Sequence, residues 1–150
     1  MSAAANAVGA GASPYGQYIV SVFGTAYKLT VLGIQRPGTD EEREMKTAGV
    51  VIVTSDRGLA GAYNSNVLRL AEKQAQVYRT EDDGVRIYAV GKKALQYFRY
   101  RKYDIGEAYI GVTDMPQYED AKRIADRLMS DYLIGEIDRV EVFATYFHSV

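Results

Sequence analysis

The amino-acid sequence predicts an α/β fold with a mostly parallel sheet of at least four strands. Short apolar runs rich in β-branched residues alternate with amphipathic stretches from residue 47 onward. The clearest run, Val50–Thr54, is apolar without interruption, as expected of an interior parallel strand covered on both faces. Strands that alternate with helices imply right-handed crossovers. We therefore expect a three-layer, Rossmann-like domain, preceded by a short helical N-terminal segment.

Four strands are expected, at Val50–Thr54, Val85–Val90, Tyr103–Val112 and Arg139–Tyr146. Helices are expected between them, at Tyr63–Tyr78, after Gly91, and between Asp114 and Gly135. In the last helix Asp114 can cap the start, Pro116 stands in the first turn, and Gly135 stops the helix. Its apolar stripe is expected to be core and comprises Ala121, Ile124, Ala125, Leu128, Met129 and Tyr132.

The first third of the chain is predicted to be a helix followed by a loop. Apolar residues in Ser13–Leu32 recur at helical spacing, and Pro14 suits a first turn. Gly33–Lys46 carries Arg-Pro-Gly and an acidic cluster, which indicates a loop. Residues 1–46 are therefore interpreted as a helical remnant plus loop, and residues 47–150 as the α/β domain.

Composition excludes several classes of protein. Eighteen basic and nineteen acidic residues give a net charge of −1, which argues against a nucleic-acid-binding protein. Zero cysteines exclude disulfides and thiolate metal sites. His148 is the only histidine, so a histidine-rich metal site or a serine–histidine relay is not expected. No apolar run is long enough to cross a bilayer.

The turn after the first parallel strand is the most informative feature, and we call it the Asp56–Gly61 corner. Such a turn lies at the carboxyl edge of the sheet, where binding sites usually form. Asp56, Arg57, Gly58 and Gly61 are compatible with an anion site, a phosphorylation site or a protein contact. They are also compatible with a structural turn, in which Asp56 accepts backbone N–H groups and the glycines give conformational freedom.

In the structural interpretation Asn64 or Ser65 caps the following helix, and Arg57 is solvated or faces a partner. Phosphate-loop motifs are poorly matched elsewhere, because Gly33–Thr39 lacks the lysine and Gly91 has no upstream glycine. A receiver domain would need an acidic pair at the end of an earlier strand, which the sequence does not offer.

Three segments carry a family resemblance. They are VIVTSDRGLAGAYNSN, VGKKALQYFRYRKYDI and PQYEDAKRIADRLMSDYLIGEIDRVEVF, in this order over about Val50–Phe143. Together they resemble the central α/β domain of the gamma subunit of the F-type rotary ATP synthase. The resemblance implies a chain that lacks most of the N-terminal and all of the C-terminal axle helices of that family.

The resemblance further implies a non-catalytic rotor component, the central stalk's foot, which couples proton flow through the membrane ring to ATP synthesis on partner subunits. The implied partners are the epsilon subunit, the c-type ring and the alpha/beta hexamer, with no cofactor, metal or nucleic acid. The implied location is peripheral, on the cytoplasmic face of a bacterial inner membrane or its mitochondrial or chloroplast equivalent.

The resemblance assigns the corner residues to shaping the sheet corner or contacting a partner, and these are Asp56, Arg57, Gly58, Gly61, Tyr63 and Asn64. An alternative hypothesis is a small anion- or nucleotide-binding α/β module, or an enzyme, that uses the Asp56–Gly61 corner. Its physical motivation is the attraction of helix N-termini for phosphate.

Overall fold

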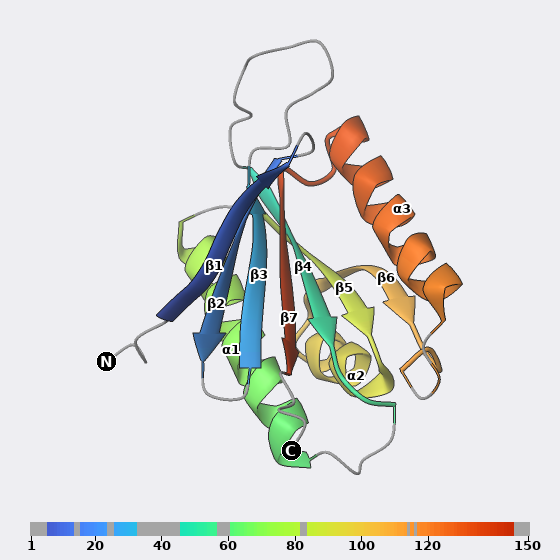
Figure 1. Ribbon diagram of the computed structural model, residues 1–150. Helices are drawn as coiled ribbons and strands as arrows, with labels where there is room; N and C mark the ends of the chain where they lie inside the picture. Colours follow the sequence, from blue (N-terminus) through green and yellow to red (C-terminus); the bar gives the residue numbers. More distant parts are fainter. Residues whose placement is uncertain are drawn as a thin grey trace.

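The structure is a computed structural model, and it describes residues 6–13, 16–23, 26–32, 46–56, 61–81, 84–113, 115 and 117–145. Seven strands form one sheet in the order β1-β2-β3-β7-β4-β5-β6 (Figure 1). The elements are β1 (Asn6–Ser13), β2 (Gly16–Phe23), β3 (Ala26–Leu32), β4 (Thr47–Val53), α1 (Gly61–Thr80), β5 (Gly84–Val90), α2 (Lys92–Tyr100), β6 (Asp104–Tyr109), α3 (Tyr118–Ile134) and β7 (Arg139–Thr145).

The four predicted strands form the parallel half of this sheet, which confirms the α/β fold class. β4 pairs in parallel with both β5 and β7, and β5 pairs in parallel with β6. β4 lies in the interior of the sheet, and Ala48, Val50 and Ile52 are fully buried there. Its uninterrupted apolar run is explained by helices on both faces of the strand.

The predicted helix over Ser13–Leu32 is wrong, because strands occupy this part of the chain. β1, β2 and β3 form an antiparallel meander, and β3 continues it by pairing antiparallel with β7. The sequences of β2 and β3 are rich in β-branched and aromatic residues, which favour strands. Their apolar residues fit both a helical period and a strand period. The strand conformation prevails because β3 pairs with the edge of β7, which would otherwise be unpaired.

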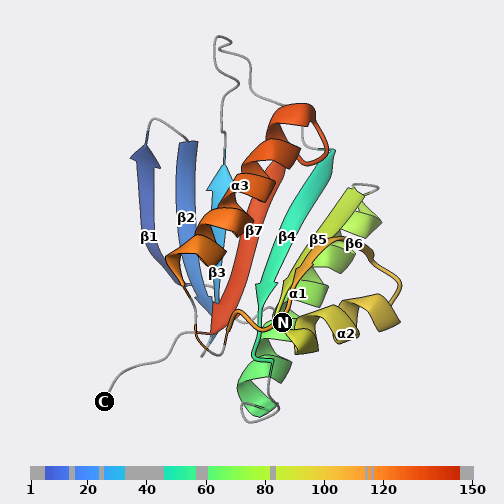
Figure 2. The ribbon, with the colours of Figure 1, turned by 90° about the vertical axis from the view of Figure 1, so that its right-hand side faces the viewer.

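The helices lie in two layers, one on each face of the sheet. Figure 2 shows α3 on one face and α1 and α2 on the other. The chain runs from β4 through β5 to β6 in one direction and then returns to β7 on the far side of β4. Since parallel crossovers are right-handed, this reversal of direction places α3 opposite the other two helices.

Each layer of helices has its own core. On the α1–α2 side the core includes Ile52, Val67 and Phe98, all fully buried. On the α3 side it includes Val51, Tyr88 and Tyr132. None of the described helices is long and apolar enough to span a membrane.

The α3 layer is more loosely packed than its sequence predicts. Of the expected core stripe, Tyr132 is buried, Ile124 and Leu128 are half-buried, and the remaining residues are exposed. An open apolar cavity of about 470 Å³ lies between the N-terminal half of α3 and the valines of the sheet. The stripe is therefore only partly core.

The start of α3 also differs from the prediction, while its end agrees. Its N-cap is Gln117, whose backbone N–H donates to the Asp120 carboxylate at 3.1 Å. The expected cap, Asp114, lies outside the described residues. Gly135 ends the helix in the left-handed conformation at φ 90°, as its position predicts.

The different packing of the two faces is testable by alanine substitution. Ile52→Ala removes a fully buried side chain, so we expect it to lower the free energy of unfolding by about 2–5 kcal/mol. The Met129 side chain on α3 is 57% exposed, so Met129→Ala should lower the free energy of unfolding by less than about 0.5 kcal/mol. Urea unfolding followed by circular dichroism measures both. Equal losses for the two variants would contradict the burial described here.

Candidate functional site

The Asp56–Gly61 corner lies at the carboxyl end of β4, at the point where the strand order reverses. β4 lies between β5 and β7. After β4 the chain adds β5 and β6 on one side, and it then crosses over to add β7 on the other side. In open α/β sheets this switch point is where ligands usually bind. The position of the corner is therefore that of a site, and its side-chain contacts decide what it can do.

The carboxylate of Asp56 joins three separate segments of the chain. It accepts hydrogen bonds from the backbone N–H of Lys92 at 2.9 Å and from that of Gly111 at 2.9 Å. The hydroxyl of Thr113 donates to it at 2.9 Å and in turn accepts the N–H of Asp56 at 3.2 Å. The ends of β4 and β6 and the start of α2 are thereby held to one side chain.

These contacts set the ionisation of Asp56. Partial burial of the carboxyl opposes ionisation, but the hydrogen bonds from Gly111, Thr113 and Lys92 outweigh it and lower the pKa of Asp56 below its usual value. Lys92 is the first residue of α2, so the carboxylate also lies at the positive end of the helix dipole. The place that a bound anion would take at this helix N-terminus is already held by Asp56.

A second contact, between Thr54 and the Gly91 turn, supports the corner from beneath. The backbone N–H of Thr54 donates to the carbonyl of Val90 at 2.8 Å, and its hydroxyl accepts the N–H of Ala94 at 2.9 Å. Gly91 has φ 100°, and a Cβ there would stand 2.2 Å from the carbonyl oxygen of Thr54. Only glycine fits this close approach of two strand ends.

Asn64 is part of the corner, but it does not cap the helix as predicted. α1 begins at Gly61, so Asn64 and Ser65 both lie within the helix. The Asn64 side chain is buried, accepts the N–H of Ser55 at 3.2 Å and donates to the Ser55 hydroxyl at 2.8 Å. It ties α1 back to the end of β4.

The other predicted corner residues are only partly placed. Gly61 is the first residue of α1 and Tyr63 lies in its first turn. Arg57 and Gly58 lie outside the described residues. The contributions of Thr54, Gly91, Gly111 and Thr113 were missed in the sequence, although a glycine one or two residues after the end of each of two strands was a usable indication.

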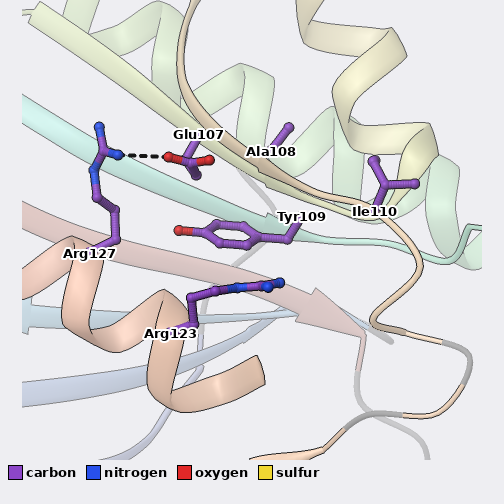
Figure 3. A pocket seen from close by; sticks show the side chains of 6 residues that line it. All are labelled: Glu107, Ala108, Tyr109, Ile110, Arg123 and Arg127. Carbon is purple, nitrogen blue, oxygen red and sulfur yellow. Dashed lines mark hydrogen bonds and ion pairs between the residues drawn. The ribbon is translucent and has the colours of Figure 1, made fainter. Parts of the chain in front are cut away.

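A polar cavity of about 400 Å³ lies elsewhere, between β6 and α3 (Figure 3). There Arg127 donates to Glu107 at 2.7 Å and to the buried Asp131 at 3.0 Å, and Asp131 also accepts the hydroxyl of Tyr88 at 2.6 Å. Burial disfavours the charge on Asp131, yet the hydrogen bonds from Tyr88 and Arg127 prevail and lower its pKa. Arg127 is thus committed to carboxylates of its own chain.

Among the described residues no group of three or more His, Asp or Glu side chains could hold a metal ion. Asp56 at the corner and Glu107, Arg127 and Asp131 at the cavity are engaged by internal hydrogen bonds.

Comparison with known proteins identifies the class. The family model described as ATP synthase matches residues 1–150. The ATP synthase gamma chain of Kineococcus radiotolerans is 37% identical over 142 residues, which cover 92% of this chain and 46% of that protein. The gamma chain of Mycolicibacterium smegmatis is 43% identical over 105 residues, covering 70% of this chain and 34% of that protein.

A third relative, the ATP synthase gamma chain of Trichormus variabilis, is 41% identical over 110 residues, covering 73% of this chain and 35% of that protein. The chain belongs to the ATP synthase gamma-subunit family. It spans about half or less of the length of these relatives.

The hydrogen bonds of Asp56 predict a pH-dependent contribution to stability. Because its pKa is lowered on folding, the contribution is fully present above the usual value of 3.8 and is lost as pH falls through the folded-state pKa. Asp56→Asn should cost about 1–3 kcal/mol at pH 7, and the gap to the unsubstituted chain should narrow in acid. Unfolding by urea across the acid range measures this. Asp126→Asn, in an exposed pair with Lys122, is the matched control and should show no such gap.

The close contact at Gly91 predicts a second loss. Gly91→Ala should cost more than about 3 kcal/mol, since it combines a backbone conformation reserved for glycine with a clash against Thr54. Gly111 also has a positive φ, 82°, but a Cβ added there would meet no atom within 4 Å apart from its chain neighbours. Gly111→Ala should therefore cost only about 1–2 kcal/mol. Thermal unfolding compares them, and a Gly91→Ala variant as stable as Gly111→Ala would refute the close approach.

Proposed function

We propose that this chain is a non-catalytic part of the central stalk of the rotary, proton-translocating ATP synthase. In this proposal residues 47–150 form the α/β foot of the rotor, which couples proton flow through the membrane ring to ATP synthesis on partner subunits. The observation that supports it best is membership of the gamma-subunit family, combined with a corner whose carboxylate is engaged by its own backbone.

In this proposal the corner is scaffold. Asp56 and Asn64 connect β4 to α2, to the end of β6 and to α1 through the hydrogen bonds described above. Arg57, Gly58, Gly61 and Tyr63 complete the turn or contact a partner subunit. No substrate, cofactor or metal is required at the corner.

The packing of the domain suits a part that carries torque. Packed protein interiors deform little, so a sheet with helices on both faces resists twisting. Buried ion pairs and hydrogen bonds add to this, because Tyr78 donates to the fully buried Glu141 at 2.5 Å and thereby links α1 to β7. A rigid foot passes rotation from one contact surface to another.

The proposed partners are the epsilon subunit, the c-type ring and the alpha/beta catalytic hexamer. The proposed location is the membrane periphery, on the cytoplasmic face of a bacterial inner membrane or the equivalent organellar face. The ATP chemistry would belong to the partner subunits.

Binding of the cognate epsilon subunit tests this proposal. We expect a complex at micromolar concentration in size-exclusion chromatography and calorimetry, because the foot should present its partner surface without the rest of the enzyme. Ile52→Ala, a core variant, serves to show that binding depends on the folded domain. A well-folded chain that fails to bind epsilon would contradict the proposal.

The competing hypothesis of an anion- or nucleotide-binding module makes the opposite prediction. Titration with ATP, ADP, phosphate and magnesium should give no saturable heat, because Asp56 occupies the start of α2. Saturable binding that is lost in Arg57→Ala would support a ligand site at the corner and overturn its role as scaffold.

A further inference from the structure

The solvent side of the α1–α2 layer is strongly basic. Eight exposed cationic side chains lie on these two helices and the turn after α2. Arg79 stacks on Tyr103 and Arg101 pairs with Glu72. We call the other six the basic face: Arg69, Lys73, Lys92, Lys93, Arg99 and Lys102. α1 and α2 cover the same face of the sheet (Figure 1). The cations therefore share one side of the molecule.

Among the described residues, these charges have no carboxylate partner. No carboxylate in the described part lies within ion-pair distance of any of the six. Glu72 is the one acidic residue within the two helices, and it is engaged by Arg101 at 3.2 Å and by the hydroxyl of Tyr97. On α3, by contrast, Lys122 pairs with Asp126 at 2.7 Å.

The basicity is local, because the whole chain has a net charge of −1. Like charges gathered without counter-charges repel one another, and a nearby anionic partner removes that cost. The basic face is thus a surface whose charge favours an anionic partner, on a protein whose overall charge does not.

The composition of the face indicates which kind of partner. Protein interfaces have an apolar core and are depleted in lysine. Four of the six cations here are lysines. Among the described side chains of α1 and α2, the large apolar ones that are exposed are Val77, 45% exposed, and Tyr100, 83% exposed. A charged, extended surface such as a lipid headgroup layer needs only clustered Lys and Arg. A tyrosine among them suits the membrane–water interface.

We propose that the basic face binds the headgroup surface of a membrane that contains anionic phospholipid. Lys92 and Lys93 at the start of α2 and Arg99 and Lys102 at its end contact phosphate groups, with Tyr100 at headgroup level. Each cation contributes about a fivefold factor to partitioning, and salt screens the attraction. The inference rests on the charges of the face and not on the stalk role, so the two can fail separately.

Vesicle co-sedimentation of the full chain tests the proposal. We expect binding at low salt to vesicles of phosphatidylglycerol and phosphatidylcholine in equal parts, none to phosphatidylcholine alone, and release at high salt. Lys93→Glu with Arg99→Glu should weaken binding by about tenfold or more. Lys122→Glu with Arg123→Glu makes the same change in net charge on α3 and should leave binding within about twofold.

Circular dichroism confirms that both double variants are folded. Equal losses in the two would mean that the net charge of the chain, not this face, drives binding, and would overturn the proposal. Absence of binding to anionic vesicles at low salt would do the same. A chain that ignores the vesicles but binds a short poly(U) oligonucleotide through the basic face would also overturn it, in favour of nucleic acid.

Discussion

The Asp56 carboxylate fixes the edge of the sheet on which everything after β4 depends. Its hydrogen bonds to Lys92, Gly111 and Thr113 bring together the ends of strands that are far apart in sequence. The close contact of Gly91 with Thr54 holds the same strand ends from below. With these ends fixed, α2 has its first N–H groups satisfied and α1 can leave β4 at a set angle. A loose corner would allow β4, β5 and β6 to move independently.

The parallel half of the fold could be predicted because its signals are local. The apolar run of β4 and the stop of α3 at Gly135 are read from single segments. The antiparallel half could not, because the apolar residues of 16–32 satisfy two periods and long-range pairing with β7 decides. The corner was located by its sequence, but not its partners, since Gly111 and Thr113 reach Asp56 only through tertiary structure. Asn64 was misjudged as a cap for the same reason.

Membership of the gamma-subunit family and the geometry of the corner fit together physically. A site that binds a substrate needs unsatisfied donors or acceptors that face a cavity, whereas Asp56, Asn64 and Arg127 direct their polar atoms at their own chain. Such internal satisfaction gives stiffness, which the proposed role in the central stalk requires. The surfaces left for partners are then the outer sides of the helices, and the two layers differ there. In the described part of the chain the cations of the basic face have no carboxylate partner, while those of α3 are paired.

The two ends of α3 are held to the sheet to different degrees, and this affects how the domain opens locally. Its C-terminal half is held to the sheet by Asp131, which accepts a hydrogen bond from Tyr88 of β5, and by Arg127, which donates to Glu107 of β6. Its N-terminal half lies over the open apolar cavity above the valines. Thermal fluctuations will therefore displace the N-terminal end of α3, near Tyr118, more than the part near Asp131. Amide protons in the first turns will exchange with solvent long before those near Asp131.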